Sequence, residues 1–308
     1  MKTLILMSIL FLGAVSVQAQ TVKELNDQGL AYLKQNNFPS AVDAFTKAIN
    51  ADHNNSEAYA DRGLAYIKLG DLTSAISDTT QAIEINPKFV AAYNNRGTAY
   101  IIQGNVKGAI ADYDKAIELN PKNVSAYANR GRALMSEGSL ADSITDYSKA
   151  IEIRPNTDSL YVDRSIVYVK KGDLALAIAD LNKAVDINPK QSVAYTVRGT
   201  IYYNQGNFVA AIADFSQAIV IDPKDTKSYM SRALTFLRGN HANEAVTDLS
   251  KVLEINPNDP SAYFNRAVGY YQLKQYDKAW ADVHKTQGLG GAVNPDFMAA
   301  LKSASGNK

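Results

Sequence analysis

Apolar and polar residues alternate along this chain with the spacing of α-helices. Between residues 90 and 123, apolar or small residues recur at intervals of three and four in two separate runs. The first run contains Ala92, Tyr93, Gly97, Tyr100 and Ile101, and the second contains Ala109, Ile110, Tyr113, Ala116 and Ile117. Such spacing places the apolar residues on one face of a helix. The stretch therefore predicts two consecutive amphipathic helices.

A short turn separates the two predicted helices, and a proline follows the second. Gly104 can take the left-handed conformation that ends a helix, and Asn105 can cap the next helix by accepting a backbone N–H. Pro121 disfavours helical geometry in Asn120, the residue before it. We therefore expect a helix–turn–helix hairpin that ends near residue 120.

The hairpin recurs along the chain with a period of 34 residues, which three residue types mark in register. The ladders are Tyr59, Tyr93, Tyr127, Tyr161, Tyr195, Tyr229 and Tyr263; Arg62, Arg96, Arg130, Arg164, Arg198, Arg232 and Arg266; and Pro87, Pro121, Pro155, Pro189, Pro223 and Pro257. A fixed period of this length predicts an all-α solenoid of stacked units. Residues 20–293 contain eight such repeats, at 22–55, 56–89, 90–123, 124–157, 158–191, 192–225, 226–259 and 260–293.

Small residues recur where the two helices of a repeat are expected to meet. Gly63, Gly97, Gly131 and Gly199 lie in first helices, and Ala75, Ala109, Ala177 and Ala211 lie in second helices. A minimal side chain lets two backbones approach closely, and aromatic residues such as Tyr113, Tyr147 and Phe215 can fill the space around them. A large residue at one of these places is expected to overpack the pair.

These features resemble those of tetratricopeptide-repeat (TPR) proteins. The similarity rests on the 34-residue period, the aromatic residue near the start of each repeat, Gly or Ala at place 8, Ala at places 20 and 27, and Pro at place 32. It covers residues 22–293. The resemblance implies antiparallel helix pairs that stack into a right-handed superhelix, a form of α-solenoid. It also implies a concave groove, lined mainly by the first helices, that binds a peptide or another protein.

In the TPR pattern, places 2, 5, 9, 12 and 13 of each repeat face the groove. The resemblance therefore assigns partner binding to Asn94, Thr98, Ile101, Ile102, Arg132, Met135, Ile166, Val169, Thr200, Tyr203, Asn204, Met230, Leu234, Leu237, Arg238, Phe264 and Tyr271. These places differ between repeats and are mostly apolar, so Met and aromatic side chains are candidate anchors for a peptide. The alternative for each residue is packing between neighbouring first helices.

An acidic ladder accompanies the arginines, at Asp78, Asp112, Asp146, Asp180, Asp214, Asp248 and Asp282. Because the two ladders match in number, we expect each Arg to pair with an Asp of its own or the adjacent repeat. The alternative is a basic track for an acidic ligand.

The two ends of the chain differ from the repeats. Met1–Ala19 combines Lys2, a 14-residue apolar run and Val17-Gln18-Ala19, which predicts a secretory signal peptide cut before Gln20. A membrane anchor is the alternative, although the run is shorter than the about 20 residues that span a bilayer. Residues 294–308 predict a C-terminal capping helix in which Phe297, Ala300 and Leu301 cover the last repeat, against Trp280.

Composition narrows the function further. The chain has 32 basic and 31 acidic residues and no Cys. The balanced charge argues against a nucleic-acid partner, and the lack of Cys excludes disulfides and thiolate metal sites. The three His residues are scattered, and no catalytic or phosphate-binding motif occurs. We therefore expect no catalytic, metal or cofactor site and no membrane span after the leader is removed.

The prediction from sequence is an exported, non-enzymatic scaffold that binds a protein or peptide in its concave groove. The signal peptide points to a periplasmic or secreted location, in a bacterium. One alternative is a structural envelope protein that assembles with itself. A third is a protein that binds cell-wall glycan.

Overall fold

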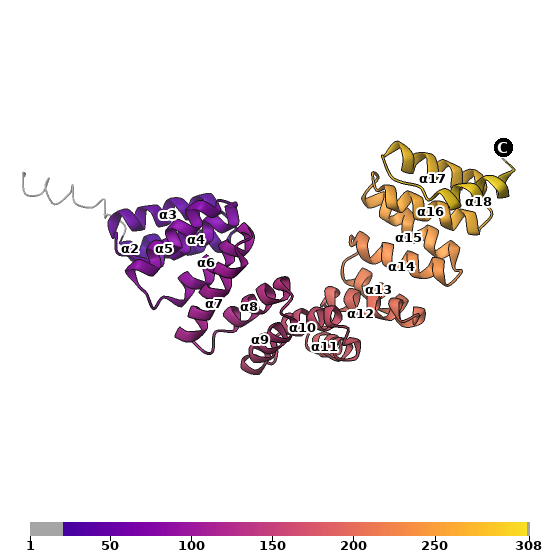
Figure 1. The fold of residues 1–308 in the computed structure, drawn as a ribbon. Coiled ribbons are helices and arrows are strands. Elements are labelled where there is room, and N and C mark those ends of the chain that lie inside the picture. The colour runs from indigo at the N-terminus through magenta and orange to yellow at the C-terminus, as the bar shows by residue number, and fades with distance from the viewer. Residues whose placement is uncertain (1–20, 307–308) are drawn as a thin grey trace, which may run out of the picture. The chain divides into compact units, whose positions relative to one another are not determined.

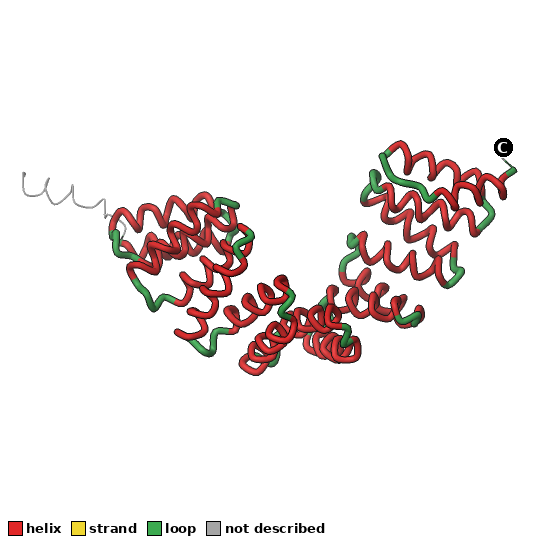
Figure 2. The backbone as a smooth tube through the Cα atoms, in the orientation of Figure 1, coloured by secondary structure: helices red, strands yellow, loops and turns green. Residues whose placement is uncertain are grey.

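The computed structural model describes residues 21–306, so the predicted signal peptide lies outside the described part. All regular secondary structure in this part is α-helical (Figure 2). Its seventeen helices are α2 (Val22–Lys34), α3 (Phe38–Ala51), α4 (Ser56–Leu69), α5 (Leu72–Ile85), α6 (Val90–Gln103), α7 (Val106–Leu119), α8 (Val124–Glu137), α9 (Leu140–Ile153), α10 (Asp158–Lys171), α11 (Leu174–Ile187), α12 (Ser192–Asn204), α13 (Phe208–Ile221), α14 (Thr226–Arg238), α15 (Ala242–Ile255), α16 (Pro260–Gln272), α17 (Tyr276–Gly288) and α18 (Pro295–Ser305). The predicted all-α solenoid of helix pairs with a C-terminal helix is confirmed.

The chain divides into two compact units, with the boundary between Ile153 and Arg154. The N-terminal unit contains α2 to α9, and the C-terminal unit contains α10 to α18 (Figure 1). Within each unit the first helix of a repeat packs on its second helix, and that second helix packs on the first helix of the next repeat. Each unit therefore holds four repeats, and the C-terminal unit also holds α18.

The helices of a pair approach closely where the sequence has Gly. A Cβ atom on Gly97 would lie 2.7 Å from Cε1 of Tyr113, and one on Gly131 would lie 3.1 Å from Cε2 of Tyr147. Both distances are shorter than ordinary van der Waals contact. The predicted close approach is confirmed, because the aromatic ring of the second helix occupies the space that a side chain would need.

The turns also follow the sequence signals. Gly104 has a φ of 88°, its N–H donates to the Ile101 carbonyl, and Asn105 Oδ1 accepts from the Gly108 N–H at 3.0 Å. Where repeats 1, 7 and 8 lack Gly at this place, another residue adopts the left-handed conformation. These residues are Asn36, Asn240 and Lys274, with φ of 56°, 61° and 59°. The turn geometry is thus the same in all eight repeats.

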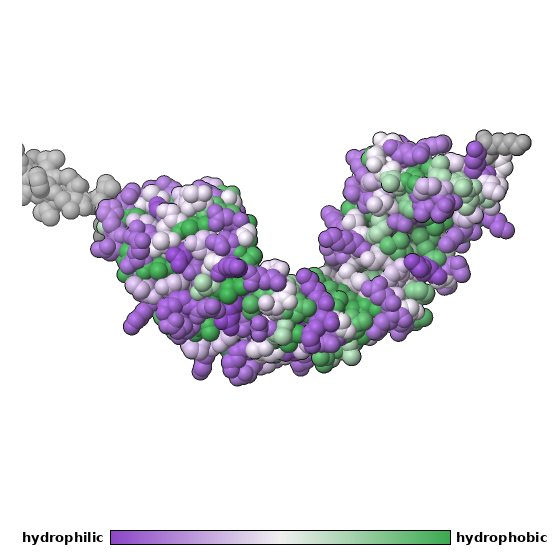
Figure 3. All heavy atoms as spheres, viewed as in Figure 1, coloured by the Kyte–Doolittle hydropathy of each residue, from purple (hydrophilic) through white to green (hydrophobic). Residues whose placement is uncertain are grey.

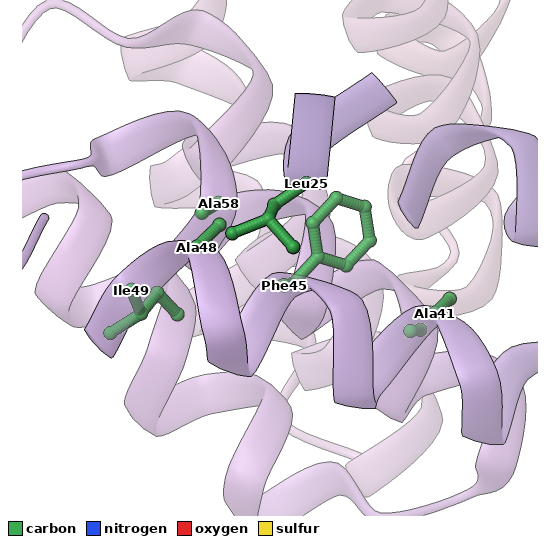
Figure 4. Packing of buried hydrophobic residues seen from close by; sticks show 7 residues of the cluster. Leu25, Ala41, Phe45, Ala48, Ile49 and Ala58 are labelled. Carbon is green, nitrogen blue, oxygen red and sulfur yellow. The ribbon is translucent and has the colours of Figure 1, made fainter. Parts of the chain in front are cut away.

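The core of each unit is a series of small apolar clusters between successive helices. In the first repeat, Phe45 of α3 is fully buried and lies beside Leu25 of α2 (Figure 4). Ala48 and Ile49 from α3 and Ala58 from α4 complete the contact with the next repeat. Burial of these side chains from water is the main stabilising contribution to the stack.

The arginines of the ladder lie on first helices. There they link the second helix of their own repeat to the second helix of the preceding repeat. In repeat 3, Arg96 donates from Nε and Nη2 to the two carboxylate oxygens of Asp112, at 2.8 and 2.7 Å. Its Nη1 donates to Oγ1 of Thr80 in the preceding repeat, at 3.2 Å. The equivalent ion pairs are Arg62–Asp78, Arg130–Asp146, Arg164–Asp180, Arg198–Asp214, Arg232–Asp248 and Arg266–Asp282. The expected pairing of the two ladders is confirmed.

The last helix, α18, covers the end of the C-terminal unit. Leu301 is fully buried against Ala267, Ala279 and Val283, and Trp280 Nε1 donates to Ser305 Oγ at 3.1 Å. Phe297 packs on the same cluster. The predicted contact between this helix and the last repeat is confirmed. No helix within residues 21–306 combines the length and the apolar character that a bilayer crossing requires.

Candidate peptide-binding surface

The N-terminal unit has a hollow of about 300 Å³ between the first helices α6 and α8. Four of the predicted partner-binding residues line it, namely Thr98, Ile101, Ile102 and Arg132, together with Asn129, Tyr113, Ala133 and Ser136. Ile102 is 57% exposed, so an apolar side chain is available to a ligand. Four of the six residues that the TPR pattern assigns to the groove in repeats 3 and 4 are therefore brought together here.

Several lining residues of this mainly apolar hollow carry hydrogen-bonding groups. Thr98 Oγ1 donates to the Asn94 carbonyl at 2.9 Å and lies 3.4 Å from Tyr113 Oη. Burial raises the pKa of Tyr113, so the phenol stays protonated and can donate. Hydroxyl, amide and guanidinium groups thus stand beside two isoleucines.

A wider hollow of about 630 Å³ adjoins the first and shares Thr98 and Asn129 with it. Asn94 and Asn95 line it from α6. Asn95 Nδ2 donates to the Ala60 carbonyl at 3.0 Å, whereas Asn94 Oδ1 is buried and has no hydrogen-bond partner among residues 21–306. A buried acceptor without a partner is costly, so Asn94 Oδ1 is an exception among the buried polar atoms of this unit.

The C-terminal unit has a hollow of about 260 Å³ between α10 and α12. Ile166, Val169, Thr200 and Asn204 were predicted from the TPR pattern, and Leu174, Thr196, Val197 and Ile201 complete the lining. Aliphatic side chains dominate, and no charged residue belongs to the lining. Figure 3 shows apolar surface gathered near α12 and α13, in contrast to the mostly hydrophilic surface over α7.

The remaining predicted residues lie outside these hollows. Met135 and Tyr203 are half-buried, and Tyr203 packs on Phe208 with a ring-centroid distance of 5.9 Å. Met230 and Leu234 pack against the core of repeat 7, and Arg238 is exposed. The role of these residues in binding stays a prediction.

Three predicted anchors make internal contacts. Leu237 is 9% exposed and belongs to a core cluster with Leu249 and Leu253. The rings of Phe264 and Tyr271 meet Phe297 of α18 edge-on, at centroid distances of 5.5 and 5.6 Å. These contacts differ from the packing between neighbouring first helices that was the alternative, and a role of the three residues in binding stays a prediction.

Several lining residues were missed from sequence because they lie outside the five groove places. Asn129 and Val197 occupy place 6 of their repeats, and Leu174 is the first residue of a second helix. The sequence could have pointed to place 6, because the residue there varies between repeats. It is Asn in repeats 3 and 4 but Val in repeat 6.

One carboxyl at place 6 has a strongly shifted pKa. Burial, with a smaller contribution from the nearby Glu57, raises the pKa of Asp61 to about 6. Repeats 3 and 4 have a neutral Asn at the same place. Elsewhere in residues 21–306, no three His, Asp or Glu side chains gather as a metal site.

Five sequence-family models match this chain, and all describe the same repeat. One, described as TPR repeat, matches residues 97–135, 166–206 and 239–274. Four described as tetratricopeptide repeat match residues 192–225, 26–88, 79–111 and 124–157. No curated protein sequence matches the chain significantly.

Solved structures share the fold at low sequence identity. A tetratricopeptide repeat protein from Parabacteroides merdae has 22% identity and a TM-score of 0.58, over 82% of this chain and 99% of that one. A TPR protein from Cytophaga hutchinsonii has 17% identity and a TM-score of 0.58, over 77% of this chain and 97% of that one. A chain of the APC/C hetero-tetramer Cut9-Hcn1 has 16% identity and a TM-score of 0.59 over 87% of this chain, which spans 52% of that longer protein.

The family models and the shared fold agree with the repeat geometry. The resemblance noted from the sequence is thereby confirmed. This chain is a tetratricopeptide-repeat protein with multiple tandem repeats.

Proposed function

We propose that this protein is an exported, non-enzymatic scaffold that binds a protein or peptide segment on the groove faces of its first helices. The observation that carries the proposal is the pair of hollows between α6 and α8 and between α10 and α12. Both are lined by places that vary between repeats, while the repeated places are used for packing. Variable side chains on a constant frame are what selective recognition of a partner requires.

Burial of apolar side chains would supply much of the affinity. Each Å² of apolar surface removed from water contributes about 25 cal/mol, from which the cost of ordering a flexible ligand is subtracted. Polar groups such as Thr98 and Asn94 would fix the orientation of the bound backbone.

Site-specific photo-cross-linking tests the binding surface. A photoreactive phenylalanine analogue is placed at Ile102 or Asn204, which are exposed on the two hollows, and the full chain is exposed to an envelope extract. We expect adducts with one or a few proteins, identified by mass spectrometry.

The matched control carries the same analogue at Val209, which is 83% exposed on the second helix α13. Equal adducts at Val209 and at the two hollow positions would contradict a groove-face site. Circular dichroism verifies that every variant keeps its helical content.

Export is the part of the proposal that rests on the sequence of Met1–Ala19 alone. The test is to express the full chain in a bacterium, fractionate the cells and determine the N-terminus of the product. We expect a periplasmic or secreted protein that begins at Gln20. A product that retains Met1 and sediments with the membrane would favour the anchor interpretation.

A further inference from the structure

We infer that α18 is an internal ligand of the last repeat, and that a partner helix with an aromatic residue and, four positions later, a leucine binds the same site by displacing it. The site lies on the groove face of repeat 8, outside the two hollows. The inference therefore goes beyond the proposed function and does not depend on it.

The site includes two groove places of the last repeat. Phe264 and Tyr271 occupy places 5 and 12 of repeat 8, which the TPR pattern assigns to a partner. The ring of Phe297 meets both rings edge-on, at centroid distances of 5.5 and 5.6 Å. A side chain of α18 thus contacts the two positions at which a side chain of the partner is expected.

A second contact lies one turn further along α18. Leu301 is fully buried against Ala267 of α16 and against Ala279 and Val283 of α17. It is the one buried residue of α18. Residues four apart lie on the same face of a helix, so Phe297 and Leu301 form one apolar edge. The site therefore recognises a helix that carries an aromatic residue at position i and a leucine at position i+4.

Few further contacts hold α18 in place. Trp280 Nε1 donates to Ser305 Oγ at 3.1 Å. Asp296 and Lys302 are exposed, and neither forms an ion pair within residues 21–306. A hollow of about 380 Å³ lies between Ser305 and the first turn of α17. The last turn of α18 is therefore not closely packed on the repeat.

The length of α18 also favours reversible docking. It has eleven residues, and a helix of this length is marginal in water without tertiary contacts. Six residues, 289–294, join it to α17. A segment tethered in this way competes with a free partner at an effective concentration of about 1 mM. The apparent affinity for the partner is therefore reduced by the fraction of molecules in which α18 occupies the site.

A peptide with the sequence of residues 294–306 tests whether the site also accepts a separate helix. The peptide carries a fluorescent label, and its binding to the full chain is followed by fluorescence anisotropy. In the full chain, Leu301→Ala weakens the docking of α18 and frees the site. We expect this variant to bind the peptide at least about tenfold more tightly than the unchanged chain does, because α18 no longer competes.

Trp280 reports whether α18 has left the site. It is the single tryptophan of the chain, and it packs on the cluster around Leu301. We expect its emission to shift to longer wavelength in Leu301→Ala and to shift back when the peptide is added. Circular dichroism verifies that the repeats stay folded. Phe297→Ala, which removes a half-buried ring, replaces Leu301→Ala if that variant loses helical content.

Three controls make the result specific to this site. Adding Phe264→Ala to Leu301→Ala removes an aromatic contact from the site and should abolish most of the gain in peptide binding. Lys302→Ala changes an exposed residue of α18 and should alter neither peptide binding nor the emission of Trp280. A peptide with Ala in place of both Phe297 and Leu301 should not bind.

Three other results would overturn the inference. Absence of peptide binding to a chain that is folded and has released α18 would show that α18 is a structural cap alone. Emission that stays unchanged in both Leu301→Ala and Phe297→Ala would show that α18 is not displaced. A dimer of the unchanged chain that Phe297→Ala abolishes would assign the site to α18 of a second copy. None of these results concerns the two hollows, which the cross-linking experiment tests separately.

Discussion

The two units share the same helix pairs, turns and Arg–Asp pairs, which we call the frame, but their groove faces present different side chains. Arg96–Asp112 in the N-terminal unit and Arg232–Asp248 in the C-terminal unit form the same bidentate pair, with distances of 2.7–2.8 Å.

Their hollows differ at several equivalent places, and at two of these a polar side chain is exchanged for an aliphatic one. Thr98 and Asn129 of the N-terminal hollow correspond by register to Ile166 and Val197 of the C-terminal hollow. These two exchanges contribute to the more aliphatic lining of the C-terminal hollow, together with Ile201 in place of Ala133 and Thr200 in place of Arg132. Because packing depends on the repeated places, the residues at these two places are free to vary.

The largest expected effect tests whether the frame is equivalent in both units. Arg96→Ala and Arg232→Ala each leave a carboxylate that is about 5% exposed without its ion partner. Breaking such a pair should lower the free energy of unfolding by about 3 kcal/mol, the lower end of the range for buried pairs, because the arginines are partly exposed. Urea unfolding followed by circular dichroism measures the loss.

The control for these variants is Lys115→Ala, which removes an exposed pair with Glu118 and should leave the urea midpoint nearly unchanged. A loss in only one unit, or a loss no larger than that of the control, would show that the arginine bridges are not equivalent parts of one frame.

The second prediction concerns a difference confined to the N-terminal unit. The pKa of Asp61 is raised to about 6 in the folded protein, above its ordinary value of 3.8. Below pH 6 the folded state therefore binds a proton that the unfolded chain does not, and stability rises as the pH falls from 7 to 5. The effect is at most about 3 kcal/mol, at 1.4 kcal/mol per pKa unit.

Asp61→Asn isolates this contribution, because it gives repeat 2 the residue of repeats 3 and 4. We expect the variant to be more stable at pH 7 and to lose this part of the pH dependence. Unfolding curves at pH 5, 6 and 7 provide the measurement. An unchanged pH dependence in the variant would assign it to other groups.

The third prediction exchanges the two surfaces. Thr98→Ile/Asn129→Val introduces the aliphatic pair into the N-terminal hollow, and Ile166→Thr/Val197→Asn introduces the polar pair into the C-terminal hollow. The second exchange should weaken binding of a peptide with a central Leu about tenfold, which is about 1.4 kcal/mol. Fluorescence anisotropy with a labelled peptide measures the change, and the first exchange shows whether the aliphatic pair is sufficient by itself.

The smallest effect is expected at a turn of the frame. Lys274 has a φ of 59°, a conformation that costs a residue with a Cβ about 1–2 kcal/mol and costs Gly almost nothing. Lys274→Gly should therefore raise the free energy of unfolding by less than about 1 kcal/mol, since Gly also gains entropy in the unfolded chain. Gly104→Ala, the reverse exchange in the N-terminal unit, should be destabilising, and an opposite sign in either would contradict the shared turn geometry.

The repeated helix pairs and turns could be predicted from the sequence, because the same residues recur at the same spacing. The turn at Gly104 and Asn105 was recognised directly. Gly97 was expected to meet an aromatic ring and Arg96 to meet an Asp, and the structure identifies these partners as Tyr113 and Asp112. The candidate surface was predicted less completely. Ile102 and Ile166 line hollows as expected, whereas Leu237 is buried and Phe264 lies under α18. Asn129 and Val197, which distinguish the two hollows, were not among the predicted residues.

The sequence by itself determined the helices and their turns, because these depend on residues that are near in the chain and repeat in register. It also predicted paired Arg and Asp ladders, but the structure decided that each Arg pairs with the Asp of its own repeat. Only the tertiary structure decided which groove residues a ligand can reach. Exposure at one place depends on the side chains that the next repeat or α18 brings against it, as Phe297 does against Tyr271. Such contacts join residues that no single repeat contains, and their packing follows from the volumes of both partners.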